Sequence, residues 1–335
     1  MTDSPKVGVL GLGHWGPNLL RNFQELGALG AFCDLDPEAL ERASARFPDA
    51  DAYDDASQIL ADPSLSAVAI VTPAATHGAM VRQALAAGKH VFVEKPLCLD
   101  VAEAESLKAE ADRRGLILMV GHLLLYHPAF RTLHQQVRDG ALGRLRYIYS
   151  NRLSLGKIRR EENSLWSFAP HDISMILALT GTMPTKVAAN GSSYLTASVA
   201  DTSLTHMEFP NNISAHIFVS WLQPYKDHRM IVIGEDAMAV FDDVAEGPEK
   251  LTLYPHQVGW DGDIPVVRKA NGMSIPYEEE EPLRVECTAF LDAVAGRKDP
   301  PSDAAEGIRV LRVLNASGKA MESGDTVVLA AEETA

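Results

Sequence analysis

A glycine-rich segment, GLGHWG, carries the spacing G-x-G-x-x-G at Gly11, Gly13 and Gly16. It directly follows an apolar run that begins at Lys6 and precedes an amphipathic helical pattern, which is the context that a dinucleotide-binding turn requires. Gly11 permits the tight turn, Gly13 lets the backbone approach a pyrophosphate, and Gly16 lets the helix pack on the strand. The first N–H groups of that helix would face the phosphates. The alternative is a glycine-rich turn without a ligand.

An acidic residue, Asp34, ends the next apolar run, near the spacing of about 20 residues at which dinucleotide folds place a ribose-binding carboxylate. A carboxylate there accepts hydrogen bonds from both ribose hydroxyls and repels a 2′-phosphate. The sequence therefore favours NAD over NADP. Alternatively, Asp34 or Asp36 caps the helix that starts at Pro37, and we expect this of Asp36.

Two further segments, VTPAATH (71–77) and VFVEKP (91–96), end apolar runs in the same half of the chain. Both fall where a doubly wound sheet presents its carboxyl edge to a ligand. A lysine in such a half-buried place is costly for a purely structural role, which makes Lys95 a candidate functional residue.

The elements that position these residues alternate between short strands and helices of 10–15 residues, a pattern typical of βαβ units and a parallel sheet. Beyond about residue 122 the strands become longer and alternate in polarity, with PNN and GED as hairpin turns. We therefore predict a Rossmann-type doubly wound α/β domain over 1–122. A mostly antiparallel, open-faced sheet with helices on one face should follow over 123–335. The helices within 283–322 are candidates to pack back on the first domain.

Composition limits the class of protein. The chain has 335 residues, 46% apolar and 22% charged, with a net charge of −15, the balance of a globular protein with a sizeable core. The acidic balance argues against nucleic acid. Three cysteines without CxxC spacing indicate a reducing compartment, and we see neither a signal peptide nor a membrane span. We expect a cytoplasmic protein, and no HExxH or clustered His/carboxylate spacing predicts a metal.

The chain resembles the glucose-fructose oxidoreductase/inositol dehydrogenase/rhizopine catabolism (Gfo/Idh/MocA) family of NAD(P)-dependent sugar dehydrogenases. The resemblance rests on GLGHWG, the TP…TH segment, EKP, VGH…HPAF…GALGRLRYI and the C-terminal ECTAFLDAVAGRKDPPSDAAEGIRVLRVL. It implies a cofactor-binding set consisting of Gly11, Gly13, His14, Trp15, Gly16, Asp34, Thr72, Pro73, His77, Glu94 and Lys95.

The family also implies a catalytic pair. Its EKP lysine lies at the hydroxyl being oxidised, here Lys95, and its acid/base histidine corresponds to His171, counted back from Gly181. Such chemistry is coherent, because an imidazole suits proton removal and an ammonium stabilises a developing alkoxide. The family's Asp four residues earlier is replaced by Ser167, and Asp172 is a candidate to orient His171, cap the helix or bind substrate. Another departure is HLLLYHP (122–128), where many members carry polar substrate contacts.

Cations gather before His171, at Arg152, Lys157, Arg159 and Arg160. Each alone reads as a solvated residue that pairs with Glu161 or Glu162. Together they suggest an anionic substrate, because Arg binds phosphate or carboxylate bidentately. The run LGKIR…LWSFAPHD also resembles bacterial nucleotide-sugar 3-dehydrogenases of surface-polysaccharide synthesis. The predicted substrate-binding set is Lys95, Lys157, Arg159, Arg160, His171 and Asp172.

The sequence thus predicts an NAD-dependent dehydrogenase that oxidises a ring hydroxyl, C3 foremost, of UDP-N-acetylglucosamine or its uronic acid. The alternatives are an inositol or free-sugar dehydrogenase and a non-catalytic sugar-sensing regulator. Apolar residues in LTHMEF and AHIFVSW, on the expected open face of the sheet, predict a homodimer or homotetramer.

Overall fold

The computed structural model describes residues 5–330, which divide into two compact units. Unit 1 comprises residues 5–126 and 280–311, and unit 2 comprises 127–279 and 312–330. The segment 280–311 therefore belongs to the same unit as the glycine-rich turn. None of the helices among the described residues is long and apolar enough to cross a membrane.

Unit 1 is built on a six-stranded sheet in the order β3-β2-β1-β4-β5-β6, with every neighbouring pair parallel. The order reverses between β1 and β4, which is the switch point where such sheets bind ligands. This confirms the predicted doubly wound domain. The strands are β1 (Val7–Leu10), β2 (Leu29–Cys33), β3 (Asp51–Tyr53), β4 (Ala67–Ile70), β5 (His90–Glu94) and β6 (Leu118–Gly121).

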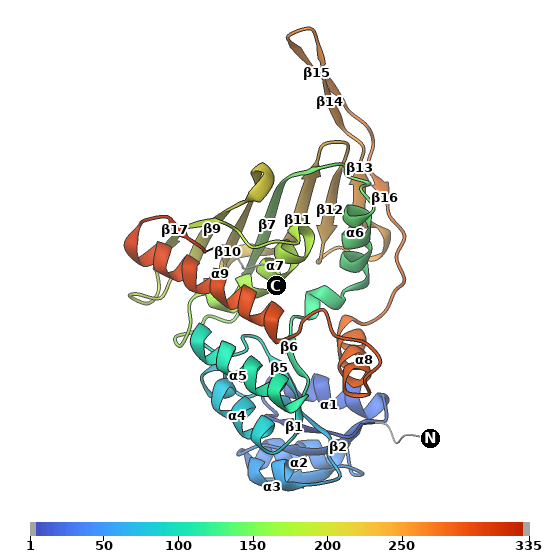
Figure 1. The fold of residues 1–335 in the computed structure, drawn as a ribbon, viewed down its shortest axis with the longest axis vertical. Coiled ribbons are helices and arrows are strands. Elements are labelled where there is room, and N and C mark those ends of the chain that lie inside the picture. The colour runs from blue at the N-terminus through green and yellow to red at the C-terminus, as the bar shows by residue number, and fades with distance from the viewer. Residues whose placement is uncertain (1–4, 331–335) are drawn as a thin grey trace. The chain divides into compact units, whose positions relative to one another are not determined.

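Helices flank both faces of this sheet, with α4 and α5 on one side and α1 and α8 on the other (Figure 1). Asp36 caps α2 as expected, since its Oδ1 accepts the Glu38 N–H at 3.0 Å. Strand β3 and helix α3 were not predicted, because β3 has only three residues and two of them are exposed. The helices are α1 (Gly16–Glu25), α2 (Pro37–Arg46), α3 (Ala56–Ala61), α4 (Ala74–Ala86), α5 (Val101–Arg114), the 3-10 turn η1 (Leu123–Tyr126) and α8 (Pro282–Val294).

Unit 2 contains a nine-stranded sheet in the order β16-β13-β12-β11-β7-β10-β9-β8-β17. Only β7 and β10 pair in parallel within it, so the mostly antiparallel sheet is confirmed for the described residues. The predicted PNN turn is present, with Asn211 and Asn212 in the left-handed region. The strands are β7 (Leu145–Leu155), β8 (Lys186–Ser192), β9 (Thr202–Phe209), β10 (Ile213–Ser220), β11 (Leu222–Gly234), β12 (Met238–Asp242), β13 (Leu251–Tyr254), β16 (Met273–Ser274) and β17 (Val327–Val328).

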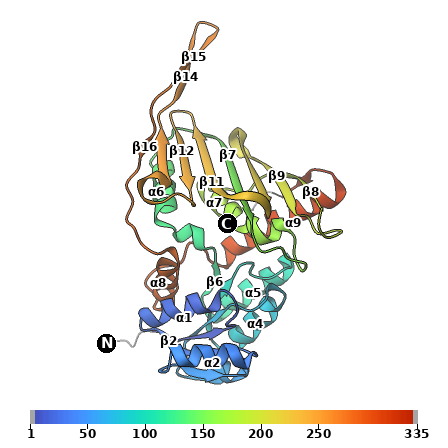
Figure 2. The same ribbon diagram turned by 180° about the vertical axis from the view of Figure 1, so that it is seen from behind.

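Helices α6 (Pro128–Arg138) and α7 (Ser164–Thr180) cover one face of this sheet, and Figure 2 shows the opposite face without helices among the described residues. Along β7, Ile148, Ser150 and Arg152 are buried while Tyr147 and Tyr149 are only half-buried. This period-two alternation places the first group on the helix-covered face. The chain passes from unit 1 into unit 2 within α9 (Ala304–Ser323).

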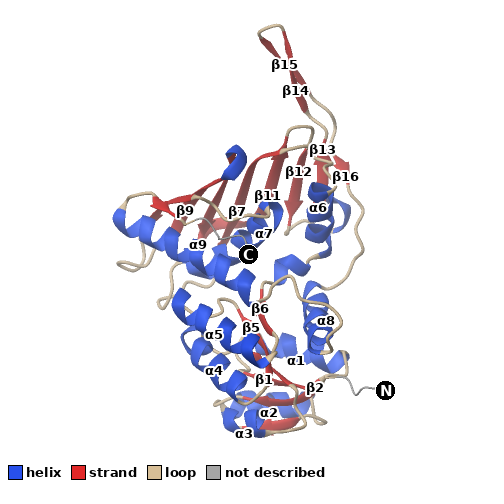
Figure 3. Ribbon diagram, viewed as in Figure 1, coloured by secondary structure: helices blue, strands red, loops and turns tan. Residues whose placement is uncertain are grey.

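A separate two-stranded hairpin, β14 (Gln257–Asp261) with β15 (Ile264–Arg268), extends beyond the sheet of unit 2 (Figure 3). Its pairing places Val258 opposite Val267 and Trp260 opposite Pro265, so one face of the hairpin is apolar. The side chains of Val258, Trp260 and Val267 are 59%, 71% and 60% exposed. This hairpin was not predicted from the sequence.

Candidate active site

The glycine turn between β1 and α1 has the geometry that a dinucleotide needs. Gly11 has φ +100°, and a Cβ there would lie 2.8 Å from the Val71 carbonyl oxygen. A Cβ on Gly16 would collide with the Gly11 carbonyl oxygen, so the helix start packs against the turn only through glycine. Gly13 is exposed, and a Cβ there would meet nothing within 4 Å. The backbone at Gly13 is therefore open to a ligand, and the turn fits a pyrophosphate.

Asp34, directly after β2, lies beside this turn. Its Oδ2 accepts the Leu12 N–H at 2.5 Å and its Oδ1 accepts the Asp36 N–H at 2.9 Å. Two backbone amides thus fix the carboxylate next to the glycine turn while leaving it partly exposed. This placement fits a residue that accepts hydrogen bonds from ribose hydroxyls.

His77 contacts two strand-end segments of unit 1. The ring is buried, with Nδ1 at 2.7 Å from the Pro96 carbonyl oxygen and Nε2 at 2.8 Å from the Thr72 carbonyl oxygen. Burial lowers the pKa of His77, although the hydrogen bonds with the two carbonyl oxygens act to raise it. The His77 ring thus links the strand-end segment at Thr72 to the segment after Lys95, and its expected contact with the cofactor stays a prediction.

Glu94 and Lys95 stand at the carboxyl end of β5, and both are half-buried. Burial raises the pKa of Glu94 to about 7, while Lys95, a hydrogen bond from the Trp15 indole and the charge of His122 act in the opposite direction. The carboxyl group also accepts a hydrogen bond from the Lys95 backbone amide. Trp15, in the glycine-rich turn, and Lys95 are thus joined through one carboxyl group, and His14 beside Trp15 is exposed.

His122, which was not among the predicted site residues, follows β6 at the same edge of the sheet. Its Nδ1 lies 2.5 Å from Glu306 Oε2, and the two side chains are 1% and 5% exposed. Glu306 lies in the first turn of α9, where its backbone N–H bonds Asp303 Oδ1 at 2.8 Å. Its place in the sequence could have indicated it, because His122 directly follows a predicted strand at the ligand-binding edge of the sheet.

His171 lies in α7, the long helix of unit 2, and its side chain is partly buried. Asn163 caps the helix by accepting the Trp166 N–H at 3.1 Å, and Gly181 ends it with φ +66°. The predicted helix and its terminating glycine are therefore confirmed. Ser167, one turn before His171 on the helix, is buried at 6% exposure.

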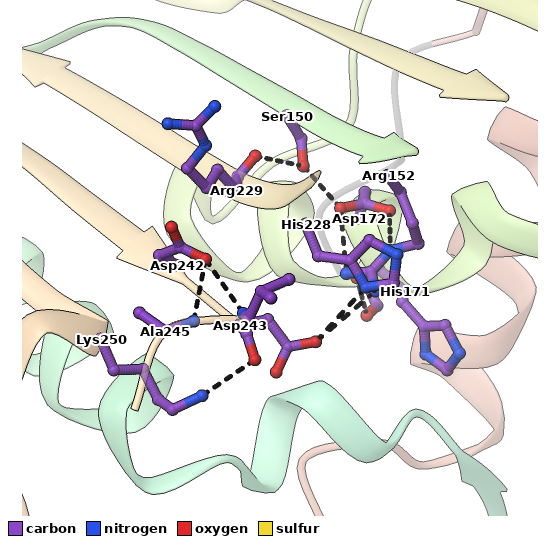
Figure 4. A network of polar contacts seen from close by, with 12 residues as sticks. Ser150, Arg152, His171, Asp172, His228, Arg229, Asp242, Asp243, Ala245 and Lys250 are labelled. Carbon is purple, nitrogen blue, oxygen red and sulfur yellow. Dashed lines mark hydrogen bonds and ion pairs between the residues drawn. The ribbon is translucent and has the colours of Figure 1, made fainter. Parts of the chain in front are cut away.

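Asp172, next to His171, is fully buried and is held from β7 (Figure 4). Its Oδ1 accepts the Ser150 hydroxyl at 2.5 Å, and its Oδ2 accepts the Arg152 Nε–H at 2.7 Å. Both oxygens of Asp172 are thus engaged inside unit 2, and its expected contact with substrate stays a prediction. Arg152 is removed from the exposed cations, since its side chain is 8% exposed.

The network continues from Arg152 to a loop after β12. Arg152 Nη1 lies 3.2 Å from His228 Nδ1 and 3.7 Å from Asp243 Oδ2. Burial would raise the pKa of Asp243, but the hydrogen bond from His228 and the charge of Arg152 lower it to about 2. Lys250 donates to the Asp243 carbonyl oxygen at 2.9 Å (Figure 4). Asp172, next to His171, is thus linked through Arg152 on β7 to His228 on β11.

The loop before α7 carries the three remaining predicted cations. Lys157 and Arg160 are exposed, whereas Arg159 Nε lies 3.0 Å from Glu162 Oε1. Arg159 therefore pairs with an acid of its own loop, which was the alternative to substrate binding for each of these cations. Within residues 5–330, no group of three or more His, Cys, Asp or Glu side chains is arranged to hold a metal ion.

Two family models match the chain. Residues 5–122 match the oxidoreductase family with an NAD-binding Rossmann fold, and residues 130–240 match the GFO/IDH/MocA C-terminal domain. The domain descriptions agree with the two kinds of sheet found in units 1 and 2.

Several proteins that are similar in sequence or structure are named as dehydrogenases of sugars or polyols. The chain is 30% identical over 312 residues to UDP-N-acetylglucosamine 3-dehydrogenase of Acidithiobacillus ferrooxidans, covering 91% of this chain and 94% of that protein. A solved structure of GnnA, the UDP-N-acetylglucosamine 3-dehydrogenase of that organism, superposes with TM-score 0.83 at 29% identity, covering 95% and 97%. The NADP-linked scyllo-inositol 2-dehydrogenase IolW of Bacillus subtilis is 24% identical, covering 98% and 96%. The chain therefore belongs to the Gfo/Idh/MocA family of NAD(P)-dependent oxidoreductases that act on CH–OH groups.

Proposed function

We propose that this protein uses NAD to oxidise a ring hydroxyl, C3 foremost, of a UDP-N-acetylglucosamine-type sugar or its uronic acid. The observation that carries the proposal is Lys95, which follows β5 at the ligand-binding edge and shares the Glu94 carboxyl with the glycine-rich turn. Similarity over nine-tenths of the chain to a UDP-N-acetylglucosamine 3-dehydrogenase supports the substrate class. In this proposal residues 1–122 bind the cofactor, and 123–335 bind substrate and mediate oligomerisation.

The residues of the chain divide the chemistry as follows. The glycine turn and Asp34 hold the dinucleotide by its pyrophosphate and ribose. When bound, the nicotinamide supplies the two-electron acceptor for the hydrogen that leaves the carbon. His171 removes the hydroxyl proton, and the Lys95 ammonium stabilises the negative charge that develops on the oxygen. The alcohol thus loses one proton and one hydrogen with its electron pair, and becomes a ketone.

The loop before α7 binds the anionic part of the substrate in this proposal. Lys157 and Arg160 are exposed there within a chain of net charge −15, 14 and 11 residues before His171. Arg159 would have to exchange Glu162 for a phosphate or carboxylate of the substrate. Guanidinium groups bind both kinds of anion through paired hydrogen bonds.

Kinetics of the Arg159→Ala/Arg160→Ala double variant test this assignment. Each lost charge-assisted bond is worth about 1.5–3 kcal/mol, so KM for the UDP-sugar should rise about tenfold to a hundredfold per bond. The kcat should fall far less, the behaviour of uniform binding, and NAD affinity should stay normal. Lys186→Ala, at an exposed ion pair elsewhere in unit 2, is the matched control. An unchanged KM would contradict the role of the loop.

An inositol or free-sugar dehydrogenase is the second candidate, because IolW and other inositol dehydrogenases are among the relatives. A preference of the wild type for the free sugar would favour it. Formation of reduced cofactor with either class would exclude the sensing regulator.

We also propose a homodimer or homotetramer with a role in surface-polysaccharide synthesis in the cytoplasm. On the helix-free face of the sheet, the His216 ring lies 5.3 Å from the rings of both Tyr147 and Tyr149, and Leu204 is 45% exposed. The apolar face of the β14–β15 hairpin adds a second surface that association would cover. A monomer in analytical ultracentrifugation would contradict this.

A further inference from the structure

A buried carboxylate–imidazole pair stands behind the end of β6. His122 Nδ1 lies 2.5 Å from Glu306 Oε2, at 1% and 5% exposure. In such pairs the carboxylate fixes the tautomer and orientation of the ring and stabilises positive charge on it. Glu306 is brought there by α9, where Asp303 caps the helix start. The ring of His122 is therefore held in one orientation by a residue 184 positions away.

The Glu94 carboxyl lies beside this pair. Glu94 and Gly121 are register partners at the ends of β5 and β6, and a Cβ on Gly121 would come within 3.2 Å of the carboxyl atoms. Glycine therefore lets the carboxyl group occupy this place, one residue before His122. The same carboxyl accepts hydrogen bonds from the Trp15 indole and from the Lys95 amide, and it feels the charge of His122.

A third acid, Glu286 on α8, is fully buried, and neither of its carboxyl oxygens has a hydrogen-bond partner among the described residues. Burial raises the pKa of Glu286 well above its usual range, and the charge of Glu94 raises it further. An uncompensated buried carboxylate is costly, so this environment favours the neutral form of Glu286. The groups around Glu94 are Lys95 after β5, His122 after β6, Glu286 and Cys287 on α8, with Glu306 on α9 acting through His122.

Two neighbours of opposite sign act on the Glu94 carboxyl. The charge of Lys95 lowers its pKa, and so does the charge of His122, whose ring is held at 2.5 Å by Glu306. Removing the His122 imidazole takes away a neighbour that lowers the pKa of Glu94 and so disfavours the ionised form of that carboxyl. The pair at His122 thus determines how readily the carboxyl beside the lysine ionises.

We propose that His122 and Glu306 are positioning residues that act on Lys95 through Glu94: the Glu306-fixed imidazole favours the ionised form of the Glu94 carboxyl and holds it in place, and this carboxyl orients the lysine ammonium toward the reacting oxygen. The proposal rests on the proposed function, in which Lys95 lies at the hydroxyl being oxidised. It adds two residues from the ends of β6 and α9 to those that prepare the reaction.

The indole N–H resonance of Trp15 provides a test that does not depend on any sugar. In protein labelled with 15N-tryptophan, this resonance, assigned with Trp15→Phe, should titrate with a midpoint near pH 7, the pKa of Glu94. Glu94→Gln should abolish the titration. His122→Asn and Glu306→Gln should each move the midpoint upward by roughly one unit, because a favourable positive neighbour is lost or weakened.

Turnover gives the second readout. Both variants should lower kcat by up to about a hundredfold, the cost of a misplaced reacting group, while KM and NAD affinity stay within about twofold. Ser302→Ala is the matched control, since it removes a buried hydrogen bond of 2.8 Å to Tyr126 in the same unit and should change neither midpoint nor kcat.

The outcomes separate this inference from the proposed function. An unmoved Trp15 midpoint in both variants would overturn the inference even in an active enzyme, and so would a shifted midpoint with wild-type kcat. A wild type that oxidises no sugar at all would instead overturn the proposed function. The Trp15 titration would still decide whether the pair controls Glu94.

Discussion

Arg152 Nε lies 2.7 Å from Asp172 Oδ2 inside unit 2, with the two side chains 8% and 1% exposed. The pair joins the middle of β7 to α7, one residue after His171. Removing one partner of a buried ion pair leaves the other charge uncompensated, which is far more destabilising than losing an exposed pair. The Arg152–Asp172 pair therefore anchors the helix that carries the proposed base.

Asp172→Asn should reduce the free energy of unfolding by about 3–5 kcal/mol, because the buried Arg152 loses its nearer carboxylate and is left with Asp243, 3.7 Å away. Chemical denaturation measures this directly. The control is Asp112→Asn, which breaks an exposed i,i+4 pair with Lys108 and should cost about 0.5 kcal/mol or less. Equal losses in the two variants would show that the buried pair does not anchor α7.

Asp34→Ala should weaken NAD binding about tenfold or more and narrow the preference for NAD over NADP. The variant loses the charge-assisted hydrogen bonds from the carboxylate to the ribose. It also loses the negative charge that repels a 2′-phosphate. Fluorescence titration with both cofactors measures the ratio. Asp36→Ala, which removes only the cap of α2, should leave the ratio unchanged. A wild type that binds NADP as well as NAD would refute the assignment.

Lys95→Met should lower kcat by about 10²–10³ with NAD affinity largely intact, because the developing oxyanion loses its cation. Lys89→Met is the control, since Lys89 is a buried lysine of the same unit whose ammonium donates to the carbonyl oxygens of Asp62 and Leu65. That control should lose stability and keep its kcat. Near-normal turnover in Lys95→Met would remove the lysine from the mechanism.

His171→Asn should lower the rate by about 10²–10⁴, the usual contribution of a general base. The acidic limb of the pH–rate profile should disappear as well, since protonation of the imidazole at low pH is what stops it from accepting the hydroxyl proton. His206→Asn, on the exposed face of β9, should leave the profile unchanged. If the limb persists in His171→Asn, the base lies elsewhere and Lys95 is the next candidate.

Features encoded by local sequence were predictable. The glycine spacing, the Asp36 cap and the helix end at Gly181 each depend on a few neighbouring residues, and the structure has all three. The alternation of short strands with helices likewise predicts a parallel sheet without any knowledge of long-range contacts.

Features that depend on distant partners were not predictable. Arg152 resembled its exposed neighbours in the sequence, although its place two residues after Ser150 on β7 was a sign that it faces the helices. Glu306 resembled an ordinary first-turn acid of a helix, and only the fold brings it to His122. The same holds for the β14–β15 hairpin, whose apolar residues carry no local sign of what would cover them.

The most direct test of the account is cofactor reduction by the wild-type protein with a panel of UDP-N-acetylhexosamines, their uronic acids, the free sugars and inositols. The absorbance of the reduced nicotinamide reports turnover, and NMR of the product locates the new ketone. We expect reduction of NAD with UDP-N-acetylglucosamine or its uronic acid, and a keto group at C3 of the product. Turnover confined to free sugars or inositols, or no cofactor reduction with any member of the panel, would contradict it.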